Sequence, residues 1–71
     1  MFINKESLNL ALAKQQMNPY EVCRKAGISY ETFRKIRNGK KCKPATIGKI
    51  AFALNTPVET LVSVNMAESG D

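Results

Sequence analysis

Residues 18–39 read NPYEVCRKAGISYETFRKIRNG, and this stretch decides the fold. Residues 18–21 (NPYE) combine an Asn that can cap a helix, a Pro at the first helical position and a Glu three residues after the cap. Gly27 suits the left-handed residue that closes a helix, and Ser29 can cap another one two residues later. Asn38-Gly39 closes that second helix in the same way. The stretch therefore predicts two short helices that meet at a steep angle across a tight turn.

Apolar residues follow a helical period on both sides of this stretch, and no segment alternates convincingly with the period of two that a strand requires. The apolar positions that define these helical faces are Leu8, Ala11, Leu12, Ile47, Ile50, Ala51, Leu54, Val58, Leu61 and Val62. Residues 56–59 (TPVE) repeat the capping-box pattern, again with Pro at the first helical position. We predict an all-α domain of five short helices. Their expected ranges are 5–15, 19–26, 30–38, 44–54 and 57–63.

Length and composition limit what else the chain can be. Its 71 residues suffice for one small domain, which we expect over residues 1–64, with a polar, flexible tail over residues 65–71. The chain has no His, and two cysteines, Cys23 and Cys42, cannot build a zinc site alone. We therefore predict no enzyme activity, no metal and no cofactor. Since no apolar run approaches a membrane span and no signal peptide begins the chain, we expect a cytoplasmic protein with free thiols.

Positive charge is concentrated in the middle of the chain. Residues 24–49 hold nine Lys and Arg side chains against one Glu, a net charge of +8, although the whole chain carries only +5. Residues 1–23 are neutral, and residues 50–71 carry −3. A solvated surface usually mixes the two signs, whereas this excess is typical of a protein that binds a polyanion.

The central stretch resembles the helix-turn-helix of the phage repressor and Cro-like (XRE-type) family of five-helix DNA-binding domains. The resemblance covers residues 8–61, and its markers are a small residue at Cys23, Gly27 in the turn, apolar Phe33 and Ile36, and the closing Asn38-Gly39. It implies a lambda-repressor-like fold with a central helix-turn-helix. It also implies that the helix over residues 30–38 is the recognition helix, which enters the major groove of DNA with its N-terminus first.

The outer face of the recognition helix follows from its core residues. With Phe33 and Ile36 turned inward, the side chains that point outward are Glu31, Arg34, Lys35 and Asn38. The resemblance implies contacts to base edges from Ser29, Tyr30, Glu31 and Lys35, with Thr32 and Arg34 adjacent. Lys35 can donate to guanine, Glu31 can accept from the amino group of cytosine, and Tyr30 can pack on a thymine methyl group. Two alternatives stay open: a Glu31 that only complements the helix dipole, and a Tyr30 that is a solvent-flanked aromatic ring.

We expect phosphate contacts on either side of the recognition helix. The N-termini of two helices, at residues 18–20 and 43–45, are positive ends that suit anions. The residues expected to contact phosphates are Asn18, Tyr20, Arg37, Asn38, Lys40, Lys41 and Lys43. Such contacts position a protein and make its affinity salt-dependent without reading the DNA sequence. The alternative for the basic loop over residues 37–43 is a segment that is only solvated.

Two positions depart from the family pattern. Family members often begin the first helix of the motif with Gln, which bonds to a phosphate and to the recognition helix, and Pro19 can do neither. Many members also pair an Arg in the first helix of the domain with a Glu just before the Asn-Gly. This chain has Leu12 and Arg37 at those positions. We expect Leu12 to pack in the core and Arg37 to be released toward phosphates.

Two functions are compatible with these features. The first is a sequence-specific transcriptional regulator, in particular a repressor that occupies a pseudo-palindromic operator on double-stranded DNA as a homodimer. The dimer surface is expected over residues 55–66, where Val62, Val64 and Met66 are apolar; covering the core is the alternative for these residues. The second is an antitoxin-like or other protein-interaction module with the same fold. Residues 65–71 are then the segment that docks on a partner protein.

Overall fold

The structure is a computed structural model, and it describes residues 1–62. Five helices follow one another: α1 (Lys5–Gln15), α2 (Pro19–Ala26), α3 (Tyr30–Arg37), α4 (Pro44–Ala53) and α5 (Val58–Leu61). Within this part of the chain there is no strand, only an isolated antiparallel bridge between Ile3 and Val62. The prediction of an all-α domain with five helices is confirmed. None of these helices has the length and apolar character that a membrane crossing requires.

The predicted bounds of α1 and α2 agree with the structure, whereas α3 and α4 each end one residue earlier than predicted. After α3, the amide of Gly39 donates to the carbonyl of Ile36 (3.1 Å) and that of Lys40 to Lys35 (3.0 Å). This pair of bonds is a Schellman motif, and Gly39 (φ 108°) is its left-handed residue. After α4, Asn55 (φ 51°) has the same left-handed conformation.

The predicted start of the fifth helix is wrong, and so is its predicted end, because α5 ends at Leu61 and Val62 is extended. The sequence suggested Thr56 as the N-cap and Pro57 as the first helical residue, but Pro57 is the N-cap of α5 and no side chain caps this helix. The Thr56 hydroxyl donates instead to the carbonyl oxygen of Leu54 at 2.9 Å. That bond satisfies a carbonyl at the end of α4, so the hydroxyl closes one helix rather than opening the next.

Several sequence predictions concern residues that the structure does not describe. They are the last residue of the predicted helix 57–63, the apolar residues Val64 and Met66 of the predicted dimer surface, the end of the predicted domain 1–64, and the tail over residues 65–71. The proposed docking segment for a partner protein coincides with that tail. All of these lie outside the described residues.

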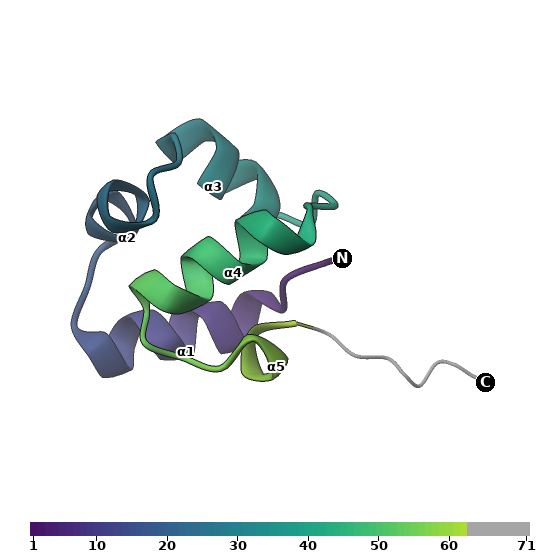
Figure 1. The fold of residues 1–71 in the computed structure, drawn as a ribbon. Helices are drawn as coiled ribbons and strands as arrows, with labels where there is room; N and C mark the ends of the chain where they lie inside the picture. Colours follow the sequence, from purple (N-terminus) through teal and green to yellow (C-terminus); the bar gives the residue numbers. More distant parts are fainter. Residues whose placement is uncertain (63–71) are drawn as a thin grey trace.

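A single apolar core holds the helices together. Its fully buried members of largest volume are Leu8, Val22, Phe33, Ile47, Ile50, Leu54 and Leu61. Figure 1 shows α4 running between the α2–α3 pair on one side and the α1–α5 pair on the other, and α4 contacts both α2 and α5. The expectation that Leu12 packs in the core is confirmed, because it is buried there. Phe33 and Ile36 are buried as well, which fixes the face of α3 that remains outside.

The N-terminal segment fastens the loop that follows α3. The amide of Cys42 donates to the carbonyl of Met1 at 2.8 Å, and the amino group of Met1 donates to the carbonyl of Cys42 at 3.2 Å. Ile3 is buried in the core, and the amide of Asn4 donates to the carbonyl of Leu61 at 2.7 Å. Cys42 is thereby held inward, whereas Lys41 and Lys43 on either side of it are exposed.

Candidate nucleic-acid interface

The turn between α2 and α3 sets the position of α3, the helix expected to enter the groove. Gly27 has φ 73° and ψ 33°, and its amide donates to the carbonyl of Cys23 at 2.9 Å. A residue with a side chain is strained in this left-handed conformation, although a Cβ on Gly27 would meet no atom within 4 Å. Ile28 packs partly against the core, and α3 begins two residues later. The Gly is therefore required by the backbone and not by a lack of space.

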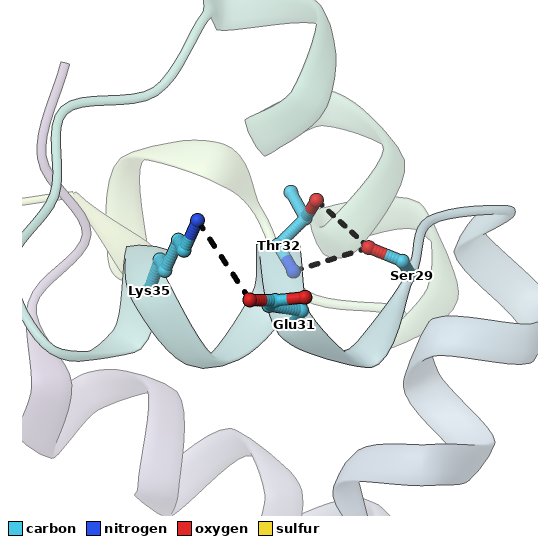
Figure 2. A network of polar contacts seen from close by, with 4 residues as sticks. All are labelled: Ser29, Glu31, Thr32 and Lys35. Carbon is cyan, nitrogen blue, oxygen red and sulfur yellow. Dashed lines mark hydrogen bonds and ion pairs between the residues drawn. The ribbon is translucent and has the colours of Figure 1, made fainter.

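Two hydroxyl groups organise the first turn of α3, as Figure 2 shows. The Ser29 Oγ accepts from the amide of Thr32 at 3.1 Å and donates to the Thr32 Oγ1 at 2.8 Å. Ser29 is thus the N-cap of α3, which confirms the capping role read from the sequence. Both residues are exposed. The Thr32 hydroxyl keeps its own hydrogen for a donor role toward a base or a phosphate.

Glu31 and Lys35 lie one turn apart on the outer face of α3 and form an ion pair, with 3.9 Å between Glu31 Oε2 and Lys35 Nζ (Figure 2). It is the one ion pair within residues 1–62. Both side chains are at least half exposed, so the pair contributes only about 0.3–0.5 kcal/mol to the helix. Glu31 also lies in the first turn, where a carboxylate complements the helix dipole. A weak pair of this kind leaves both side chains able to exchange their partner for a base edge.

The structure brings together two tyrosines that the sequence assigned to different tasks. The rings of Tyr20, at the start of α2, and Tyr30, at the start of α3, stack with their centroids 4.5 Å apart and 16° between their planes. Tyr20 was expected at a phosphate and Tyr30 at a base. Sequence reasoning missed the contact, since the residues are ten positions apart and only the angle between the helices brings the rings together.

The N-terminus of α2 is capped by its own side chains. Asn18 Oδ1 accepts from the amide of Glu21 at 2.9 Å, and Glu21 Oε1 accepts from the amide of Asn18 at 2.9 Å. This capping box is the one predicted from the sequence. It occupies two donors that an anion would otherwise use, and it places a carboxylate beside them.

The N-terminus of α4 is arranged differently. Its N-cap is Lys43, whose side chain cannot accept a hydrogen bond, and no side chain caps the helix. Beside it lies a hollow of about 310 Å³, which we call the lysine hollow. Its lining residues are Thr32, Lys35, Ile36, Lys40, Lys41, Cys42, Lys43 and Thr46. Three of these residues, Lys40, Lys41 and Lys43, are predicted phosphate contacts, and two, Thr32 and Lys35, are predicted base contacts. The hollow therefore lies between α3 and the uncapped N-terminus of α4.

Three other predicted contacts, Arg34, Arg37 and Asn38, belong to the second half of α3 and its C-cap and do not line this hollow. Arg34 is exposed on the outer face of α3, Asn38 is its exposed C-cap, and Arg37 is half-buried in the last turn. Arg37 takes part in no ion pair among the residues that the structure describes. Many family members have an ion pair between the positions of Leu12 and Arg37. In this chain no other ion pair of Arg37 replaces it among the described residues.

Neither cysteine is a reactive group at this surface. Cys23 and Cys42 are both buried and are not joined in a disulfide. Burial raises the pKa of both thiols, and for Cys42 the nearby amino-terminal charge acts weakly in the opposite direction. The Cys23 Sγ donates a weak hydrogen bond to the carbonyl of Ser29 (3.8 Å), which ties α2 to the cap of α3. Protonated, buried thiols serve packing.

A second surface, which the sequence indicated only in part, carries exposed apolar side chains. Phe52 is 87% exposed on α4 and Leu10 is 61% exposed on α1. Two hollows beside them share Gln15 and residues 55–57, which belong to the predicted dimer surface. The sequence contains a signal for this residue. Phe52 belongs to the apolar run over residues 50–54, but it does not lie on the helical face that Ile50 and Leu54 share. None of the predicted DNA contacts lines either hollow.

The fold and the basic face of α3 define a helix-turn-helix DNA-binding domain. A family model described as the Cro/C1-type HTH DNA-binding domain matches residues 7–66, and the chain belongs to that family. No curated protein and no solved structure matches the chain. The family match confirms the resemblance read from residues 8–61, and the family is a regulatory, non-enzymatic one.

Proposed function

We propose that the chain is a sequence-specific transcriptional regulator that reads double-stranded DNA with α3 in the major groove. The observation that carries the proposal is the outer face of α3. All of the residues expected to read bases are exposed there: Ser29, Tyr30, Glu31, Thr32, Arg34 and Lys35. Their donors, acceptors and aromatic ring match the kinds of group that base edges in the major groove present. In this proposal residues 1–64 form the DNA-binding domain.

The lysine hollow supplies the contacts to the DNA backbone. Lys40, Lys41 and Lys43 are exposed along one loop, and the buried Cys42 fixes that loop to the core. Cations held by a rigid loop next to a recognition helix suit the phosphates that border a groove. They contribute affinity that falls as the salt concentration rises, because binding releases counterions from the DNA.

Selection of bound sequences from a random duplex pool tests this function directly. The expected result is a preferred site that binds at least 1,000-fold more tightly than random DNA at physiological salt. Titrations at several salt concentrations then separate the two kinds of contact, because phosphate contacts set the salt dependence and base contacts set the preference. A preference below about tenfold contradicts a sequence-specific regulator.

We extend the proposal to a homodimer that represses by covering its operator. One module buries only about 600–1,000 Å² on DNA, and two copies on half-sites about 34 Å apart double the sequence that is read. The surface around Phe52 suits a second copy of the chain, since it carries both a protruding aromatic side chain and a hollow of about 830 Å³ that Phe52 itself borders. A surface with both parts can be its own partner across a two-fold axis.

Two serine variants test the dimer. Phe52→Ser removes the exposed ring from this surface, whereas Phe2→Ser, the control, removes an exposed ring that borders neither hollow. Sedimentation of the protein on a selected operator is expected to give a 2:1 complex for the wild type and Phe2→Ser. Phe52→Ser is expected to give a 1:1 complex at the same concentration. A selected site without dyad symmetry, or a 1:1 wild-type complex, contradicts the homodimer.

A further inference from the structure

We propose that Tyr20 and Tyr30 act as one aromatic unit that recognises the C5 methyl group of a pyrimidine in the major groove. This inference rests on the proposed function. It assigns to Tyr20 a part in reading bases, and it extends to the stacked pair the methyl contact that the sequence suggested for Tyr30 alone.

The geometry of the stack limits what the two rings can do separately. With 4.5 Å between their centroids and 16° between their planes, each ring lies over part of one face of the other. Such aromatic pairs contribute attraction beyond the area that they bury. The stack therefore restrains the side chain of Tyr30, which otherwise projects from the first residue of α3. Tyr20 is in this respect a positioning residue for a side chain of the recognition helix.

The stack keeps part of its surface for a ligand. Tyr20 is 60% exposed and Tyr30 is 37% exposed, although each ring covers part of the other. The exposed part lies at the N-terminal ends of the two helices of the motif, which is the end of α3 expected to enter the groove. A partly exposed aromatic pair in that place offers an apolar surface between otherwise polar side chains.

The chemistry of the groove supplies one apolar group that such a surface can read. Of the four natural bases, only thymine presents a methyl group in the major groove, and 5-methylcytosine presents the same group at the same place. The neighbouring readers Glu31 and Lys35 carry charges suited to amino and carbonyl groups of bases. The methyl group of a pyrimidine is thus the feature that remains for the tyrosines.

The stack also connects the start of α2 to α3, a connection that Pro19 cannot make. Pro19 cannot form the hydrogen bond by which Gln in other family members joins the start of the first helix of the motif to the recognition helix. The ring of Tyr20, the next residue, makes contact with the first residue of α3 instead. An aromatic contact thereby takes the place of a polar one.

Uracil substitution in the selected operator tests the proposal, because it removes a single methyl group and nothing else. Each thymine of one half-site is replaced in turn. At one position the wild-type protein is expected to lose about fourfold in affinity, the value of one buried methyl-sized group. At the same position, a 5-methylcytosine–guanine pair is expected to bind about fourfold more tightly than a cytosine–guanine pair.

Three variants assign this discrimination to the pair. Tyr20→Phe keeps the stack and removes a hydroxyl, so it should retain the full ratio of thymine to uracil affinity. Tyr20→Ala and Tyr30→Ala break the stack, and each should bring the ratio close to one. Thermal melting followed by circular dichroism establishes that each variant is folded at the temperature of the titration. If Tyr20 also contacted a phosphate through its hydroxyl, Tyr20→Phe would weaken binding to both operators equally.

Several results overturn the proposal. They are equal affinity of the wild type for thymine and uracil at every position, no gain from 5-methylcytosine, and an unchanged ratio in Tyr20→Ala. Each of these can occur while the protein still prefers its selected operator, and the proposed function then stands without the tyrosine unit. If selection returns no preferred sequence, both proposals fall together.

Discussion

The N-termini of α2 and α4 have the same first helical residue but differ in how they are capped. Both have Pro at the first helical position, and both were expected from the sequence to hold a phosphate. At α2 the reciprocal bonds of Asn18 and Glu21 satisfy the cap, and the first turn carries a carboxylate. At α4 the N-cap is Lys43, the first turn has no acidic residue, and three more lysines line the adjacent hollow. Of these two helix N-termini, we therefore expect that of α4, which is uncapped and has lysines beside it, to be the better anion site.

We propose that the same difference separates two tasks on the surface proposed to face DNA. The end near α2 carries the stacked tyrosines and two acidic side chains, Glu21 and Glu31, which suit contacts to bases better than contacts to phosphates. The end near α4 carries lysines. We therefore expect sequence discrimination to depend mainly on the first end and salt-dependent affinity mainly on the second.

Neutralising the lysine hollow should have the largest effect. Replacing Lys40, Lys41 and Lys43 together by Gln is expected to weaken DNA binding about 100-fold at physiological salt and to lower the salt slope by about 2.7, because three phosphate contacts are lost. Binding titrations at several salt concentrations measure both quantities. The ratio of operator to random affinity should change little. A variant that loses this ratio while keeping the salt slope would reverse the assignment of tasks to the two ends.

A new N-cap on α4 should stabilise the fold and at the same time weaken DNA binding. In Lys43→Asp, the new carboxylate can accept from the amides of the first turn, and the free energy of unfolding is expected to rise by about 1 kcal/mol. The same change puts a negative charge in the lysine hollow, and affinity for DNA should fall by about tenfold or more. Lys43→Ser is the matched control, since it supplies a cap without a charge and should lose only about fivefold in affinity. A stabilised variant with unchanged affinity would show that phosphates do not reach this helix.

Removing the cap of α2 should affect folding more than binding. Asn18→Ala is expected to lower the free energy of unfolding by about 1 kcal/mol, which corresponds to about 4–8 °C in Tm for a domain of this size. The salt slope of the folded variant should stay that of the wild type. Asn18→Ser retains a capping oxygen and serves as the control, with an expected Tm near that of the wild type. A fall in the salt slope in both variants would assign a phosphate contact to the Asn18 amide after all.

The sequence predicted those parts of the structure that depend on neighbouring residues. The capping box of Asn18 and Glu21, the left-handed Gly27 and the Ser29 cap all follow from groups within three or four positions of one another. The failure at Thr56 has the same local origin. Its hydroxyl had two backbone targets within reach, and the carbonyl of Leu54 at the end of α4 was the one it bonded. A capping pattern does not state which of two adjacent helices it serves.

Features that join distant segments could not be read from the sequence. The Tyr20–Tyr30 stack depends on the angle between α2 and α3, and the lysine hollow depends on how Met1 and Cys42 fasten the loop after α3. The charge distribution along the sequence identified the lysines as a group, but it did not indicate that they line one hollow. Phe52 is an intermediate case, since the helical pattern of its neighbours excluded it from the core without indicating what it would face.

The tyrosine stack also gives the protein an optical label of its own. The chain contains two Tyr and no Trp, so all of its tyrosine emission comes from one stacked pair at the N-terminal end of the recognition helix. Fluorescence excited near the red edge of tyrosine absorption therefore reports on a single spot of the surface. In Tyr20→Phe the emission comes from Tyr30 alone. The proposed entry of α3 into the major groove can thus be followed in real time without any attached dye.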